Sequence, residues 1–175
     1  MRGKDKARKT AGMGMLFALA LVLQFLESLV PVPFPAAPGI KLGLSNTVTM
    51  FCLFTLGVPC AVLVALLKGV FAFITRGPVA GVLSLAGGIL SVIVMHILDG
   101  AGQSKGLTCV SGAVSHNIGQ LAAECVMMKS SAALYYIPVL TVSGVVMGTV
   151  TAYVFRSIRP YLDRIYGEGR DRQQK

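Results

Sequence analysis

Apolar runs, each long enough to form a helix, fill most of this chain of 175 residues and are separated only by short breaks. Charged residues make up 13% of the sequence, whereas a typical soluble domain carries about 25%. Inside a bilayer the backbone must satisfy its own hydrogen bonds, which restricts such runs to helices. The sequence therefore predicts an all-α integral membrane protein that crosses the cell membrane several times.

Proline and glycine divide the apolar part into six runs, which predict a bundle of six transmembrane helices. The expected helices cover approximately residues 12–32, 44–56, 59–75, 79–98, 107–128 and 132–155. A basic tail, 1–11, precedes the membrane domain at 12–156, and a second basic tail, 157–175, follows it. The first run starts like a signal peptide, but its length and its polar residues Gln24 and Glu27 favour a retained helix.

The positions of Lys and Arg orient the predicted bundle. Six spans bring both ends of the chain to one side of the membrane, where twelve basic residues then lie, against three on the other side. Because basic residues concentrate on the cytoplasmic side, both termini are expected in the cytoplasm. The net charge of +9 is explained by contact of the two tails with the headgroups of the lipid bilayer, and no nucleic-acid partner is expected.

The fifth run carries a polar stripe that consists of His116, Asn117, Gln120 and Glu124. At about 100° per residue, these four side chains share an arc of roughly 100° on a helix. An ionisable group in hydrocarbon is costly without partners, so this face is expected to point into the bundle. It either forms a ligand site or joins helices by hydrogen bonds, and we favour the ligand site.

Polar residues of three other helices are expected at a similar depth. With the termini in the cytoplasm, Glu27, Asn46 and Arg76 fall in the outer half of the membrane. Gln120 and Glu124 fall in the same half, beneath a proline-rich segment that follows the first helix. This grouping predicts a binding pocket that opens outward rather than a continuous path for ions.

Lys68 stands near the centre of its helix, where an unpaired ammonium group is costly. It is expected either to contribute to the ligand site by pairing with Glu124 or Glu27, or to extend its stem to an interface. His116 has three candidate roles, namely ligand binding, proton transfer and a hydrogen bond to a neighbouring helix. His96 is expected near the cytoplasmic interface.

The sequence contains no pattern typical of a metal site or of a catalytic centre. Its four cysteines lack metal-ligand spacing, and no second His or Cys stands near His116. No phosphate-binding loop is present, so ATP hydrolysis would require another protein. The aspartates lie outside the apolar runs and form no cluster for magnesium and a diphosphate. We therefore expect neither an enzyme nor a bound metal or cofactor.

Small residues recur every four positions on three of the expected helices, which is typical of close helix–helix contacts. They are Ala61, Ala65 and Gly69; Gly144, Gly148 and Ala152; and Gly14 and Ala18. Most such stripes pack inside a bundle, whereas an exposed one would be a docking surface for another membrane protein.

Three stretches carry specific sequence motifs. They are Lys-Leu-Gly-Leu-Ser-Asn at 41–46, Leu-Ser-Leu-Ala-Gly-Gly at 83–88 and Ala-Val-Ser-His-Asn-Ile-Gly-Gln at 113–120. They resemble the small bacterial membrane family called Gx transporters, which also carries the name heptaprenyl diphosphate synthase component I. The resemblance extends over residues 12–156, and Ser45 replaces the alanine that is usual in the first stretch.

That family looks like the substrate-binding S components of energy-coupling factor (ECF) transporters, which are six-helix proteins with an outward pocket. The resemblance implies uptake of a vitamin-like, flavin or isoprenoid-like small molecule, energised by a separate coupling transmembrane subunit and ATPases. It also implies docking on that subunit through the first helix, where Gly14 and Ala18 replace the usual pair of alanines.

Two other functions stay open at this point. The second family name implies an accessory component of a prenyl diphosphate synthase. A proton- or ion-coupled carrier that uses His116, Glu124 and Lys68 is the third alternative.

Overall fold

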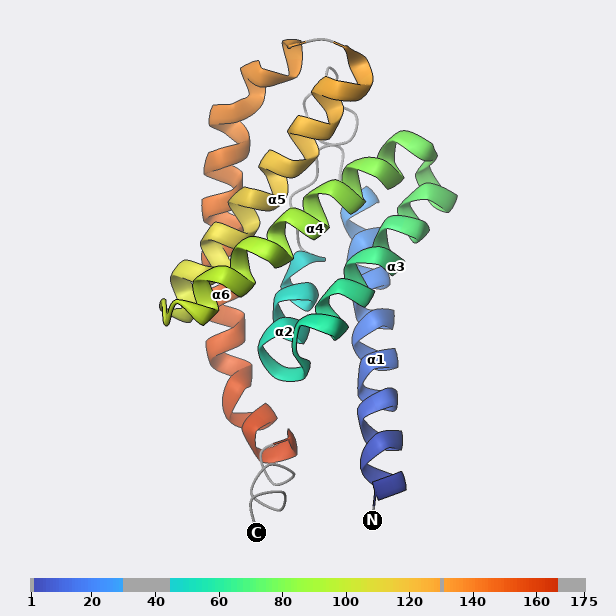
Figure 1. Cartoon of the computed structure of the whole chain (residues 1–175), viewed down its shortest axis with the longest axis vertical. Coiled ribbons are helices and arrows are strands. Elements are labelled where there is room, and N and C mark those ends of the chain that lie inside the picture. The colour runs from blue at the N-terminus through green and yellow to red at the C-terminus, as the bar shows by residue number, and fades with distance from the viewer. Residues whose placement is uncertain (1, 30–44, 130, 167–175) are drawn as a thin grey trace.

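The computed structural model describes residues 2–29, 45–129 and 131–166, which form a bundle of helices (Figure 1). The helices are α1 Arg2–Leu29, α2 Asn46–Leu56, α3 Val58–Arg76, α4 Pro78–Gly100, α5 Lys105–Met128 and α6 Ile137–Tyr166, with a 3-10 helix, η1, at Ala132–Tyr136. The described part of the chain contains no strand. The predicted all-α fold is confirmed.

Three segments are long and apolar enough to cross a membrane, and they are Val58–Arg76, Pro78–Gly100 and Leu134–Pro160. Two shorter apolar helices, Thr10–Leu26 and Asn46–Leu56, accompany them in the described part. The chain is therefore a multi-pass membrane protein. The count of six spans and the cytoplasmic placement of both ends stay predictions.

Glycine and proline make the tight connections on either side of α3. Gly57 and Gly77 both have a φ of 92°, in the left-handed region that glycine adopts without steric cost. Pro59 and Pro78 stand in the first turns of the helices that follow. Backbone N–H groups there have no partner within the helix, so proline removes no hydrogen bond. Because these signals are local, helices α2 to α5 begin and end within a few residues of the predicted positions.

Helices α1 and α6 extend beyond the apolar runs that predicted them. α1 begins at Arg2, so residues that we expected in a basic tail are helical, since Lys, Arg and Ala favour helix. α6 begins at Ile137, later than expected, because η1 takes up the preceding residues, and it continues past Pro160 to Tyr166. Hydrophobicity thus marks the membrane part of each helix and not its full length.

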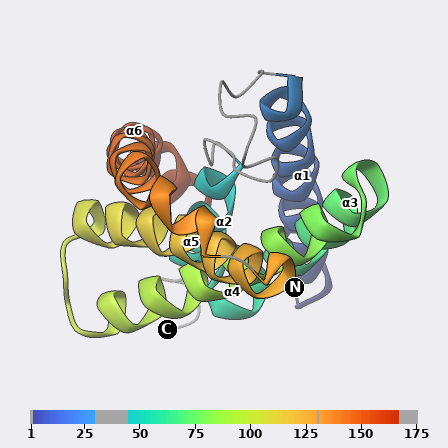
Figure 2. The same cartoon turned by 90° about the horizontal axis from the view of Figure 1, so that it is seen from above.

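α5 is the central helix of the bundle. It packs between α4 and α6, and α3 packs against α4 (Figure 2). Glycines allow these close approaches, since a Cβ added to Gly119 would lie 2.9 Å from the Ala86 carbonyl oxygen, and one on Gly144 would lie 3.0 Å from Val114 Cα. Gly69 of α3 packs in the same way against Leu85. The stripes on α3 and α6 therefore serve packing inside the bundle, as predicted.

The small residues on α1 are exposed, unlike the stripes on α3 and α6. Gly14 and Ala18 are both exposed, and a Cβ added to Gly14 would meet no atom within 4 Å. Next to them, Met13 and Leu16 pack against the core cluster that contains Cys60 of α3. The described bundle therefore leaves this stripe of α1 open on its surface.

Both ends of the described chain lie at one end of the bundle, where α1 begins and α6 ends (Figure 1, bottom). The first turns of α1 project beyond the turn between α2 and α3 (Figure 1).

Candidate ligand-binding site

Buried polar side chains from four helices meet inside the bundle. They are Gln24 on α1, Asn46 and Thr49 on α2, Lys68 on α3, and His116, Gln120 and Glu124 on α5, none of them more than 5% exposed. Polar groups at such depth are normally hydrogen-bonded or engaged with a ligand. Asn46 and Lys68 are in contact, and the polar face of α5 is buried as well. Their grouping into one binding site stays a prediction.

Lys68 joins three helices through hydrogen bonds. Its Nζ donates to Asn46 Oδ1 at 2.9 Å and to Thr49 Oγ1 at 3.4 Å, both on α2. The backbone carbonyl of Lys68 accepts a bond from Gln24 Nε2 of α1 at 3.3 Å. Gln24 and Thr49 were not among the predicted site residues, because a single amide or hydroxyl in an apolar run is a weak signal.

Of the two ion pairs expected for Lys68, the described residues test only the one with Glu124. Its side chain is buried and does not extend to an interface, and its described side-chain contacts are with neutral oxygen atoms. Glu124 makes no ion pair with Lys68, because the one ion pair among the described side chains joins Lys105 and Asp99. The side chain of Glu27, the other predicted partner, lies outside the described part of the structure.

His116, Gln120 and Glu124 follow one another along the buried face of α5, and we call them the α5 row. Residues four apart on a helix are about 6 Å apart along the axis, so the row is about 12 Å long. Within the described part of the chain, His116 Nδ1, Gln120 Oε1 and Glu124 Oε2 are buried and have no hydrogen-bond partner. A buried polar atom without a partner costs about 1–3 kcal/mol. Three of them in one row favour a ligand whose donors would satisfy them.

α4 presents its backbone to the α5 row at Gly87. A Cβ added there would lie 2.7 Å from the His116 carbonyl oxygen, 2.8 Å from Gln120 Cγ and 3.0 Å from His116 Cε1. α2, whose Asn46 and Thr49 accept hydrogen bonds from Lys68, also contacts α5. The glycine-containing stretch of α4 and the Ser-His-Asn stretch of α5 therefore meet at the site, beside the Lys68 junction.

Among the remaining predicted site residues, Asn117 lies on a different face of α5 from the α5 row. Asn117 Nδ2 donates to the Leu140 carbonyl at 2.8 Å, which ties α5 to α6 on another face of the helix. Arg76 is the half-buried last residue of α3, and Glu27 lies near the end of α1. The proline-rich segment that we expected over the pocket lies outside the described residues.

An apolar groove of about 250 Å³ lies between α3 and α4, away from the α5 row. It is lined by Val58, Val62 and Ala65 of α3 and by Ile89, Val92, Ile93, His96 and Ile97 of α4. None of the buried polar side chains of the α5 row lines it. The groove and the polar site are therefore separate features of the bundle.

Metal-binding residues do not gather in the described part of the chain, where no three His, Cys, Asp or Glu side chains could hold an ion together. The four cysteines are all free, and three of them are buried.

Fold and site together define a multi-pass helical membrane protein with a buried polar face on its central helix. A family model described as heptaprenyl diphosphate synthase component I matches residues 16–158. The chain belongs to this family, and the membership predicted from its three signature stretches is confirmed. No curated protein and no solved structure matches the chain.

Proposed function

We propose that the protein is the membrane-embedded substrate-binding subunit of an uptake system, similar to the S components of ECF transporters. The observation that carries this proposal is the α5 row, with three buried polar side chains whose free hydrogen-bonding atoms lie on one face. Ligand sites in helical bundles are built from inward side chains on facing helices. A vitamin-like small molecule bound at the row would satisfy these atoms.

The chemistry of the row discriminates between the ligand classes that the family resemblance implies. Gln120 Oε1 is an acceptor, and so is a carboxylate oxygen such as Glu124 Oε2. A flavin brings N–H and O–H donors, whereas an isoprenoid chain brings none. We therefore favour a heterocyclic, donor-bearing molecule of the flavin type at this site.

The Lys68 junction supports the proposal because it makes one side of the site rigid. Lys68 connects α1, α2 and α3 through Gln24, Asn46 and Thr49, and α2 in turn contacts α5. A preorganised site loses less free energy in ordering its side chains when a ligand binds.

Transport would require a separate coupling transmembrane subunit and ATPases. The exposed pair Gly14 and Ala18 supports docking of that subunit on α1, because small residues allow two helix backbones to approach closely. The location of both ends of the chain at one end of the bundle supports six spans with cytoplasmic termini.

The family description favours a second candidate, an accessory component of a prenyl diphosphate synthase. In that role the protein would bind a catalytic partner and would change the rate or the product length of prenyl chain elongation. This function needs no ligand at the α5 row, which is the basis for separating the two candidates.

The first experiment is to purify the full chain and identify extracted small molecules by mass spectrometry. The proposal expects one polar small molecule in a nearly equimolar amount, retained without any partner protein. It would be overturned by a chain that retains no polar molecule and on which prenyl elongation by a soluble synthase depends.

A further inference from the structure

A lysine and a glutamate are both buried inside the bundle, and they do not pair with each other. Lys68 of α3 is 4% exposed, and Glu124 of α5 is 3% exposed. The Lys68 ammonium group donates to Asn46 and Thr49 of α2. No described side chain forms an ion pair with Glu124, and its Oε2 has no hydrogen-bond partner. The described chain therefore supplies no counter-charge to this buried acid.

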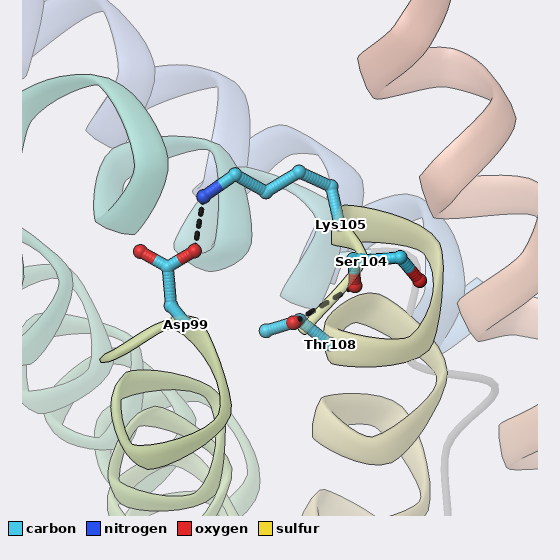
Figure 3. A network of polar contacts seen from close by, with 4 residues as sticks. All are labelled: Asp99, Ser104, Lys105 and Thr108. Atoms are coloured by element: carbon cyan, nitrogen blue, oxygen red, sulfur yellow. Dashed lines mark hydrogen bonds and ion pairs between the residues drawn. The ribbon is translucent and has the colours of Figure 1, made fainter. Parts of the chain in front are cut away.

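The basic residues at the two ends of α5 do not neutralise Glu124 either. Lys105, at the start of the helix, is paired with Asp99 of α4 (Figure 3). Lys129, directly after the helix, is exposed, whereas Glu124 is buried. Neither ammonium group forms an ion pair with the Glu124 carboxylate. The positive charge that this carboxylate requires must therefore come from outside α5.

A buried carboxylate without a counter-ion is costly, because it has lost its hydration and gains no attraction in return. Protonation would remove the charge of Glu124, but Oε2 would still lack a hydrogen-bond partner. A neutral N–H group of a ligand would satisfy Oε2 and would leave the negative charge buried. A cationic N–H group would satisfy the oxygen and neutralise the charge, and opposite charges attract far more strongly in the interior than in water. The environment of Glu124 therefore favours a cationic donor.

We propose that the molecule bound at the α5 row carries a cationic nitrogen, of the ammonium or amidinium type, that pairs with the Glu124 carboxylate. This inference rests on the proposed function, because it specifies the charge of the molecule that the binding subunit takes up. Gln120 Oε1, one helical turn away, accepts a neutral N–H group of the same molecule. The two residues stand about 6 Å apart along the helix axis. An aromatic ring with nitrogen substituents at opposite positions bridges such a distance, which agrees with a heterocyclic ligand.

The binding of two matched probes to the purified full-length chain tests this charge. Para-aminobenzamidine carries an amidinium cation and a neutral amino group at opposite positions of one ring, and para-aminobenzamide is its neutral counterpart of nearly the same shape. Molecules that co-purify are first removed, and the affinity of each probe is then measured by equilibrium dialysis at neutral pH. Glu124→Gln removes the charge and keeps an acceptor oxygen. Asp99→Asn is the matched control, because it removes a carboxylate charge outside the α5 row.

The native chain is expected to bind para-aminobenzamidine about tenfold or more tightly than para-aminobenzamide, because only the amidinium group neutralises Glu124. This preference should vanish in Glu124→Gln and persist in Asp99→Asn. The comparison of the two probes on the native chain requires no variant, so it is independent of how well Glu124→Gln folds. The proposal is overturned by equal affinities of the native chain for the two probes, by binding of neither probe, or by a preference that survives in Glu124→Gln.

The molecule that co-purifies with the native chain separates a failure of this inference from a failure of the proposed function. A cationic molecule that is lost from Glu124→Gln supports both. A molecule without a cationic nitrogen that is retained by the native chain and lost from Gln120→Ala leaves the proposed function in place and overturns the inference about charge. A chain that retains no polar molecule and binds neither probe overturns both.

Discussion

The ammonium group of Lys68 lies 2.9 Å from Oδ1 of Asn46 in the interior of the bundle. A lysine at this depth is tolerated only where its donors find acceptors, and two oxygens of α2 are among them. Because Gln24 of α1 donates to the Lys68 backbone, a single residue connects three helices. This junction is the fixed side of the candidate site, and the α5 row stands beside it.

Removal of either partner of the Lys68–Asn46 bond should destabilise the bundle. Lys68→Met and Asn46→Leu are each expected to lower the free energy of unfolding by about 1–3 kcal/mol, because the remaining polar group stays buried. In the double variant the two losses should couple by about 0.5–3 kcal/mol. Equilibrium unfolding of the native protein, both single variants and the double variant in mixed micelles measures these free energies. Strictly additive losses would show that the bond contributes nothing.

Asn117 is expected to stabilise the fold without contributing to ligand binding. Asn117→Ala removes the bond to the Leu140 carbonyl and should lower stability by about 1 kcal/mol while ligand retention is unchanged. Thr149→Ala is the control, since its exposed hydroxyl bonds only to Val145 of its own helix. Loss of the ligand from Asn117→Ala at normal stability would instead place Asn117 in the site.

Gly87 is expected to tolerate no side chain. In Gly87→Ala the new methyl group would collide with the His116 backbone and with Gln120, so α4 and α5 must separate at a cost of about 1–3 kcal/mol. Gly14→Ala, where the space is open, should be neutral or should stabilise α1 by up to about 1 kcal/mol. Thermal melting of both variants checks the contrast, and equal melting temperatures would contradict the close α4–α5 contact.

The exposed pair on α1 should affect transport and not binding. Gly14→Phe places a large ring where a coupling subunit is proposed to dock, so cellular uptake of the identified ligand should fall while the purified variant retains it. Met15→Phe, at the exposed neighbouring position, is the control. Uptake that is normal in Gly14→Phe would remove Gly14 and Ala18 from the docking surface.

The helices were predictable to the extent that their signals are local. Gly57-Val58-Pro59 and Arg76-Gly77-Pro78 mark their turns through backbone geometry alone, and the structure places turns at both. The start of α1 at Arg2 was not predicted, because hydropathy detects only the apolar part of a helix and not its polar extension. The 3-10 helix before α6 likewise depends on tertiary packing.

The candidate site was predictable only in part. The spacing of His116, Gln120 and Glu124 implies a common face, and the structure buries all three. The bonds from Lys68 to Asn46 and Thr49 were not predictable from charge, because they depend on how α2 crosses α3. The role of Asn117 depends in the same way on the position of α6.

The amount of small molecule that co-purifies with variants of the α5 row tests the central claim most directly. Gln120→Ala and Glu124→Ala should each lower the retained ligand by about tenfold or more at an unchanged melting temperature, since each removes an acceptor worth at least about 1.4 kcal/mol to the ligand. Ser91→Ala, which removes a buried bond to the Gly112 carbonyl outside the row, should retain the ligand in full. Equal ligand content in all three variants and the native protein would contradict a binding site on α5.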